Sequence, residues 1–250
     1  MNTDLAIILP KLSLLGEENT TKKIQEIYEK KESCIVHFLY FANILLNKLD
    51  REYDDSPKKR AFIAALTKWD FLLPDGIALN LLYKKYFGKD LPNLNGTDFL
   101  PYFLSHLSKE KKVEIIVYGG TEEVAQRSVD FITKSFMYRI IYAVNGFTHF
   151  DWTQVLPREN NVIRILLVGR WSPLQELWTE ENRQQIEAMK CLVFTVGGLL
   201  DFWAWTEKRA PKWARNLKIE WLYRALSHPK KNLKKTLVSL KLMKFLISSK

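Results

Sequence analysis

The sequence predicts an α/β fold in which a mostly parallel sheet is covered by helices on both faces. Three observations lead to this prediction. Short apolar segments alternate with amphipathic helical segments over the first 207 residues. The chain has 250 residues and is 47% hydrophobic, which suits one large domain with an appendage and excludes a disordered protein. The excess of positive charge is confined to residues 208–250, which form a distinct C-terminal tail.

The expected elements follow one another in regular order. Six segments are predicted to be buried strands because they are short, apolar and bounded by turn residues: 34–41, 71–73, 113–118, 138–144, 164–168 and 192–196. Helical spacing of apolar residues predicts helices between them: 44–49, 77–87, 98–107, 121–131 and 172–189. Thr121 is a suitable N-cap for its helix, and residues 50–60 are polar enough to be a loop or a helix end.

The cysteines and the N-terminus favour a cytoplasmic protein. Cys34 and Cys191 are too few for a disulfide scaffold and are expected to be buried thiols. Residues 1–10 contain an acidic residue and no basic n-region, so no secretory signal is expected. No apolar run is long enough to span a bilayer, and the four histidines lack metal-ligand spacing.

The net charge of +10 is unevenly distributed. Residues 208–250 contain thirteen Lys and Arg against the single acid Glu220, a net of +12, whereas residues 1–207 carry −2. An anionic partner is therefore expected for the tail: a membrane surface, a phosphorylated lipid or nucleic acid. Apolar and aromatic residues interleave with its lysines, which suits an amphipathic helix on an anionic membrane, and no nucleic-acid-binding motif accompanies them.

The turns that follow successive strands contain the candidate site residues. Ligands of parallel α/β sheets bind beyond the carboxyl ends of the strands, so these turns should meet at one crevice. They comprise Asn43, Asp75, Gly119, Gly120, 169–175 and 197–201.

Two of these turns suggest catalysis or phosphate binding. Asp75 follows a buried strand directly, and a carboxylate held so rigidly is well placed as a general base. The alternative is an Asx-turn residue that binds only backbone N–H groups. Gly119 and Gly120 precede a capped helix and could hold a phosphate, although Glu122 and Glu123 already occupy the positive end of that helix. The alternative is an ordinary turn.

Two further turns offer polar groups to a sugar nucleotide. Gln175 and Glu176 open a helix after Pro173 and could bind a uracil edge or sugar hydroxyls; alternatively, Glu176 only complements the helix dipole. Asp201 lies in an apolar stretch and needs a partner, either a ligand or an arginine of the tail.

An ordered series of short motifs extends along the chain. Near its end stand Asp201-Phe202, Lys-Arg-Ala-Pro at 208–211, Glu-Trp-Leu-Tyr-Arg at 220–224 and Pro229. Upstream stand Pro-Asp-Gly at 74–76, Gly-Thr-Asp at 96–98, Gly-Gly at 119–120 and Pro-Leu-Gln-Glu at 173–176. Together they resemble the WecG/TagA/CpsF family of bacterial glycosyltransferases over roughly residues 35–235. So many matches in order are specific, whereas each alone would be weak.

The resemblance implies a fold and an activity. It implies a Rossmann-like domain at 1–207 and a basic, membrane-associating helical appendage at 208–250. The implied enzyme is an inverting, UDP-sugar-dependent hexosyltransferase of N-acetylmannosaminyl or glucosyl type. Its acceptor would be an undecaprenyl-diphosphate-linked saccharide in the synthesis of exopolysaccharide, capsule, teichoic acid or common antigen.

The resemblance also implies site residues and partners. Asp75 matches the general base, Asn43 belongs to the first donor loop, and Arg209, Arg215 and Arg224 would bind a diphosphate, with no metal or other cofactor essential. The expected partners are the donor, the lipid-linked acceptor and an anionic membrane surface, without nucleic acid and with a homo-oligomer as an open option. The expected location is peripheral, on the cytoplasmic face of the bacterial plasma membrane.

Several residues depart from the family pattern. Asn93 stands where the family has an arginine, Trp171 where it has a glycine, and Leu174 where it has a basic residue. Residues 41–43 read Phe-Ala-Asn rather than Thr-Pro-Asn. These changes concern the donor pocket, so the donor sugar could differ from N-acetylmannosamine. A catalytically silent binding subunit of a polysaccharide synthase is the alternative function.

Overall fold

A computed structural model describes residues 2–50, 56–107, 111–155, 159, 161–205 and 211. Six strands form one sheet: β1 (Cys34–Tyr40), β2 (Phe71–Asp75), β3 (Lys112–Gly119), β4 (Arg139–Val144), β5 (Val162–Gly169) and β6 (Cys191–Thr195). Their order is β2-β1-β6-β5-β3-β4, and every pairing between them is parallel. The prediction of an α/β, Rossmann-like fold is confirmed.

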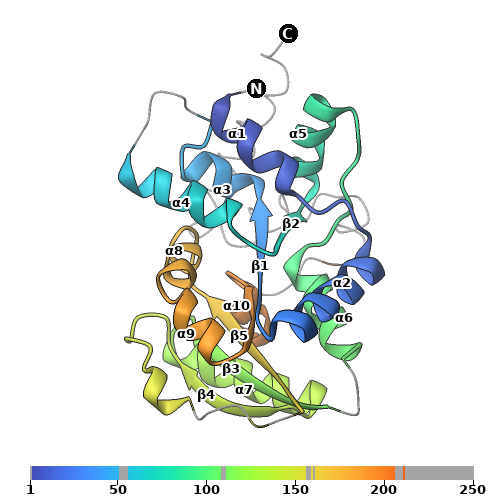
Figure 1. Ribbon diagram of the computed structural model, residues 1–250. Helices are drawn as coiled ribbons and strands as arrows, with labels where there is room; N and C mark the ends of the chain where they lie inside the picture. Colours follow the sequence, from blue (N-terminus) through green and yellow to red (C-terminus); the bar gives the residue numbers. More distant parts are fainter. Residues whose placement is uncertain are drawn as a thin grey trace.

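The helices cover both faces of this sheet (Figure 1). They are α1 (Thr3–Ile8), α2 (Glu17–Lys31), α3 (Phe41–Leu46), α4 (Pro57–Thr67), α5 (Ile77–Phe87), α6 (Gly96–Ser105), α7 (Glu122–Phe136), α8 (Leu174–Glu181), α9 (Arg183–Ala188) and α10 (Leu199–Trp203), with 3₁₀ turns η1 (Leu9–Lys11) and η2 (Trp152–Gln154). Apolar side chains of α2, α6, α7 and α10 share one core with the sheet. Those of α8 and α9 pack on the opposite face, and α1, α3, α4 and α5 form a third cluster beside β1 and β2.

The central strands explain why the sequence prediction of a parallel sheet was possible. Every residue of β5 and of β6 is buried, since helices cover both faces. Such strands require continuous apolar runs rather than alternation, and residues 165–168 and 191–194 supply them. At one edge of the sheet, Leu12 forms a parallel bridge to Leu72, which gives β2 a partner on its outer side.

A buried ion pair crosses the sheet near its amino ends. Glu114 of β3 lies opposite Arg164 of β5, and Arg164 donates to it from Nη2 at 2.7 Å and from Nε at 3.2 Å. The Arg164 side chain is only 1% exposed. Arg139 of β4 approaches the same carboxylate at 3.6 Å. Three neighbouring strands are therefore joined by charge as well as by the backbone ladder.

Several helices differ from those expected. Residues 57–67 form α4, so the expectation of a loop or helix end at 50–60 is wrong for residues 57–60. Ser56 accepts a hydrogen bond from the Lys59 N–H, and Pro57 occupies the first helical position, which together start this helix. The helix expected up to Met189 is divided into α8 and α9 at Asn182. Helix α7 extends five residues beyond the predicted end at Phe131.

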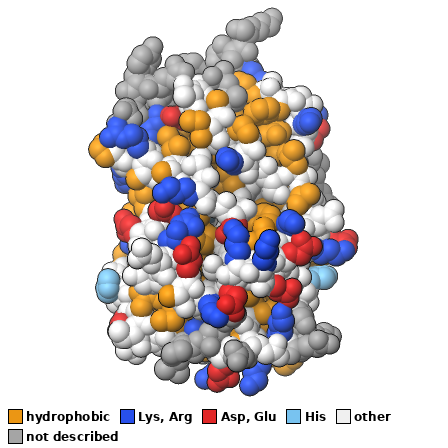
Figure 2. Space-filling view, viewed as in Figure 1, with side chains coloured by type: hydrophobic (Ala, Val, Ile, Leu, Met, Phe, Trp, Pro, Cys, Tyr) orange, Lys and Arg blue, Asp and Glu red, His pale blue; other side chains and the backbone are white. Residues whose placement is uncertain are grey.

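Figure 2 shows how side-chain types are distributed on one face. Acidic and basic side chains mix across its middle and lower parts. Hydrophobic side chains gather in its upper part, at the end of the molecule toward which β1 points in Figure 1. Exposed apolar residues at that end include Ile7 of α1 and Leu81 of α5, with 46% and 40% of their surfaces exposed. None of the helices in the described part of the chain is long and apolar enough to cross a membrane.

Candidate active site

The loops after β1 and β5 meet at the carboxyl edge of the sheet. Asn43 lies in the first turn of α3, and its carbonyl accepts hydrogen bonds from the backbone N–H and the side-chain amide of Asn47, at 3.1 and 2.9 Å. The same amide donates to Ser172 Oγ at 3.4 Å. Asn47 therefore joins the backbone of Asn43 to the loop that leads into α8.

Asp75 is the last residue of β2, and it lies in register with Tyr40, the last residue of β1. Gly76 follows with φ of +89°, and a Cβ atom there would lie 3.3 Å from the Tyr40 ring. Both facts favour glycine, which lets the chain turn sharply from β2 into α5. The half-buried Asp75 carboxylate thus stands at the carboxyl edge, immediately before the N-terminus of an 11-residue helix.

Gln175 joins the loop after β5 to the end of β6. Its Oε1 accepts a hydrogen bond from the Gly197 N–H at 3.0 Å, and its Nε2 donates to Glu176 Oε1 at 3.0 Å. Its backbone carbonyl accepts the Thr179 hydroxyl at 2.6 Å. The side chain is buried, so its observed contacts position its neighbours.

Glu176 is the most unusual carboxylate of this edge. The residue is 1% exposed, and among the described residues its Oε2 atom has no hydrogen-bond partner. Burial raises its pKa from the ordinary 4.5 to about 7, although hydrogen bonds with Gln175 and Ser172 favour the charged form. A buried oxygen that lacks a partner can accept a hydrogen bond from a ligand hydroxyl or N–H group.

Three glycines pack against one another where β3, β4 and β5 end. A Cβ atom on Gly119 would lie 2.4 Å from the Gly169 carbonyl oxygen, and one on Gly146 would lie 3.2 Å from Gly119 Cα. The Gly120 N–H donates to the Gly169 carbonyl at 3.2 Å, so it is already used within the protein. A phosphate at this turn would have to use other donors. Thr121 caps α7 as expected, accepting from the Val124 N–H.

Arg170 is a polar residue of this edge that the sequence prediction did not single out. It follows Gly169 directly, and its guanidinium carbon lies 5.3 Å from the centre of the Tyr118 ring. Its Cγ atom would lie 3.4 Å from a Cβ atom on Gly146. Its position within the turn 169–175 was the feature of the sequence that could have identified it, because such turns meet at the carboxyl edge.

Asp201 lies in α10, which follows the turn after β6. One of its carboxylate oxygens would lie 3.6 Å from a Cβ atom on Gly198. The helix is anchored by Leu200, whose carbonyl accepts the buried Ser128 hydroxyl of α7 at 3.1 Å. Asp201 is half-buried and stands on the same side of the sheet as the other turns. Arg209, Arg215 and Arg224 lie outside the described residues.

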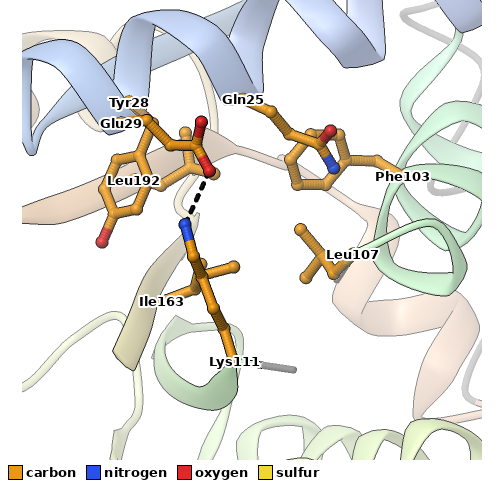
Figure 3. A pocket seen from close by; sticks show the side chains of 8 residues that line it. All are labelled: Gln25, Tyr28, Glu29, Phe103, Leu107, Lys111, Ile163 and Leu192. Atoms are coloured by element: carbon orange, nitrogen blue, oxygen red, sulfur yellow. Dashed lines mark hydrogen bonds and ion pairs between the residues drawn. The ribbon is translucent and has the colours of Figure 1, made fainter. Parts of the chain in front are cut away.

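A small pocket lies at the opposite edge of the sheet (Figure 3). Its volume is about 60 Å³, and residues at the amino ends of β5 and β6 line it together with residues of α2 and α6. An ion pair of 2.6 Å joins Glu29 and Lys111 beside it. Asp75 and Glu176 are at the carboxyl ends, so this pocket is separate from the candidate site. Among the described residues, no group of three or more His, Cys, Asp and Glu side chains could hold a metal ion.

The carboxyl edge thus carries an aspartate at the end of β2, a buried carboxylate and a stacked arginine. Comparison with known families gives a match over nearly the whole chain: residues 7–249 match the family described as "Glycosyl transferase WecG/TagA/CpsF family". The chain belongs to this family. Its members are glycosyl transferases, so a sugar donor and an acceptor substrate are its reactants. The match extends through Asn43, Asp75, Gln175, Glu176 and Asp201, and through the three tail arginines.

Proposed function

We propose that this WecG/TagA/CpsF glycosyl transferase moves a hexosyl group, with inversion, from a UDP-sugar to an undecaprenyl-diphosphate-linked saccharide. The product would serve exopolysaccharide, capsule, teichoic acid or common-antigen synthesis. The observation that carries this proposal is the position of Asp75 at the carboxyl edge of a sheet whose sequence matches the family from residue 7 to residue 249.

Asp75 is proposed as the general base. In a transfer with inversion, the acceptor hydroxyl oxygen forms a bond to the anomeric carbon while the bond from that carbon to the diphosphate oxygen breaks. The hydroxyl proton passes to a base, and the electron pair of the broken bond leaves with UDP. Asp75 is the last residue of β2, at one edge of the sheet, where its pairing with Tyr40 of β1 fixes the backbone that carries the carboxylate. Gly76 adds no side chain after it.

Glu176 and Asp201 are proposed to bind the donor. The buried Glu176 oxygen without a partner would accept a hydrogen bond from a sugar or ribose hydroxyl, and this contact would offset the cost of its burial. Gln175 supports this arrangement by holding Glu176 and Gly197 in place. The leaving diphosphate requires positive charge, which Arg209, Arg215 and Arg224 are proposed to supply through bidentate hydrogen bonds.

Association with a membrane surface is proposed through the tail and the apolar end of the described body. The tail carries a net +12, and each cation near an anionic surface contributes about 1 kcal/mol. Helices α1, α3 and α5 lie at the end toward which β1 points (Figure 1), and their exposed Ile7, Leu46 and Leu81 side chains add apolar surface. A protein bound there on the inner face of the plasma membrane would meet a lipid-linked acceptor directly.

The central test is sugar transfer by the full chain and by Asp75→Asn. A screen of UDP-sugars against a short-chain polyprenyl-diphosphate disaccharide should identify a donor for the wild type. Asp75→Asn should then lower kcat by about 10²- to 10⁴-fold while leaving UDP affinity unchanged, because the base acts only in the chemical step.

Asp90→Asn is the matched control. Asp90 is an exposed aspartate, 2.8 Å from Lys84, and its replacement should leave the rate unchanged. Normal transfer by Asp75→Asn would reject the base assignment. A wild type that transfers no sugar from any UDP donor would instead favour the silent binding subunit.

A further inference from the structure

Arg170 differs from the other arginines whose ion pairs the structure describes. Arg127, Arg139, Arg164 and Arg183 each lie within 4 Å of a carboxylate. Arg170 has no carboxylate partner in the described part of the chain. Its guanidinium instead stacks over the Tyr118 ring. The Tyr118 ring is buried, and its hydroxyl is tied to the Thr148 carbonyl at 3.3 Å. A fixed aromatic surface therefore orients a half-buried guanidinium, and no carboxylate of the described residues pairs with it.

The surroundings of Arg170 suit a flat ligand. The turns beside it, at Gly119, Gly120 and Gly146, contribute backbone rather than side chains. Phe147 follows Gly146 and leaves 86% of its surface exposed. The Asn145 side chain accepts from the Phe147 and Thr148 N–H groups, so the turn that presents this ring is held in shape. Phe147 and Arg170 thus belong to turns that adjoin at Gly146, and aromatic rings and guanidinium groups are the side chains on which nucleobases stack.

The position of Arg170 along the sheet edge indicates which part of a donor it meets. Asp75 ends β2 and Arg170 follows β5, three strands away in the order β2-β1-β6-β5. Neighbouring strands are separated by about 4.8 Å, so the two residues are on the order of 14 Å apart. The Arg170 side chain extends farther still, toward Tyr118 of β3. In a nucleotide sugar the diphosphate adjoins the anomeric carbon and the base lies beyond it, so a sugar at Asp75 places the nucleoside toward Arg170.

The chemistry of arginine then selects among bases. A guanidinium only donates hydrogen bonds. Uracil presents a carbonyl acceptor at position 4, as thymine does, whereas cytosine presents an amino donor there. A donor facing a donor leaves both groups without partners, which strongly disfavours the wrong base. An arginine at the base subsite therefore favours uridine over cytidine nucleotides.

We propose that Arg170 is the base-recognition residue of this site and binds the O4 carbonyl of a uracil base. This inference rests on the proposed function, since it assumes a nucleotide-sugar donor whose sugar lies at Asp75. Arg170 acts in donor specificity and has no part in the proton transfer.

The test is titration calorimetry of the full chain with UDP and with CDP. Wild type should bind UDP at least 10-fold more tightly than CDP. Arg170→Met keeps the aliphatic stem but has no donor, so UDP affinity should fall about 10- to 100-fold while CDP affinity changes little. Arg170→Gln carries both a donor and an acceptor, so the ratio of UDP to CDP affinity should approach one. A purely structural role for Arg170 would lower both affinities together.

Arg183→Met is the matched control. Arg183 stacks on Trp69 at 5.4 Å, much as Arg170 stacks on Tyr118, but it pairs with Glu180 on the outer helices. Its replacement should leave both affinities unchanged. Equal loss of UDP and CDP in Arg170→Met would indicate a contact with the diphosphate or ribose and overturn the proposal, as would no loss at all. A wild type that binds UDP without preference over CDP would also overturn it, whereas one that binds neither nucleotide would refute the proposed donor class itself.

Discussion

Replacement of Glu176 by glutamine should stabilise the protein at neutral and alkaline pH. The carboxyl is buried, and its pKa rises from 4.5 to about 7 on folding. For an acid whose pKa is raised in the folded state, the native protein keeps its proton over a window in which the unfolded chain has already lost it. The free energy of unfolding therefore decreases as pH rises from about 4.5 to about 7, and it stays lower above that window.

The magnitude follows from the size of the shift. Each pKa unit corresponds to about 1.4 kcal/mol, so a shift of this size costs about 3 kcal/mol at pH 8 but less than about 1 kcal/mol at pH 5. Glu176→Gln has nearly the same shape and can still bond to Gln175, yet it carries no charge. Relative to wild type, it should therefore gain about 2–3 kcal/mol between pH 5 and pH 8.

Urea unfolding followed by tryptophan fluorescence at both pH values measures this difference. Contributions of other titrating groups are common to both proteins and cancel. Glu180→Gln on the same helix is the control, because salt bridges to Lys68 and Arg183 lower the pKa of Glu180. That variant should lose a little stability at pH 8. If Glu176→Gln shows the same stability difference from wild type at pH 5 and pH 8, burial of a titrating carboxyl is not the explanation.

Three further changes test other parts of the structure. Glu114→Gln removes the charge that pairs with the buried Arg164 and should cost about 3–5 kcal/mol in urea unfolding, while an equal stability of both proteins would contradict the importance of this pair. Burial lowers the pKa of His37 well below 6.5, so only the unfolded state takes up this proton as pH falls through 6.5. The free energy of unfolding of the wild type should therefore fall by up to about 1.4 kcal/mol per pH unit relative to His37→Gln. Calorimetry at pH 5.0 to 7.5 would detect or exclude this slope. Gly119→Ala should lower Tm sharply because its Cβ would lie 2.4 Å from a backbone oxygen, whereas Gly16→Ala, with nothing within 4 Å, is the tolerant comparison in the same thermal scans.

Most strands could be predicted from sequence because burial on both faces requires continuous apolar runs, although β4 at the sheet edge has no fully buried residue. All six predicted strands agree with β1 to β6 within a few residues. The start of α4 was missed because its first residues are basic, and local polarity indicated a loop. Lys59 is in fact buried and paired with Asp4, a partner 55 residues earlier that local sequence patterns do not reveal.

The sequence indicated at which edge of the sheet the candidate site residues lie, but it did not indicate which side chains they contact. The rule for the carboxyl ends of parallel strands placed Asp75 and the 169–175 turn at one edge of the sheet. The contacts of Gln175 could not be foreseen, because its partner Gly197 is 22 residues away and the bond depends on how α8 packs. Arg170 lay within a predicted turn, but its stacking on Tyr118 depends on neighbouring strands that local patterns do not pair.

The order of the strands has a consequence for how the protein is made. β1 precedes the other five described strands along the chain, yet one of its two neighbours is β6, at Cys191–Thr195. The middle of the sheet therefore cannot close until the chain has been synthesised through Thr195, and such non-local pairing slows folding. Because Asn43 follows β1 and Gly197 follows β6, the two sides of the carboxyl edge join only at that stage. A nascent chain that stalls earlier would hold a hydrophobic β1 with one edge unpaired and would depend on chaperones to avoid aggregation.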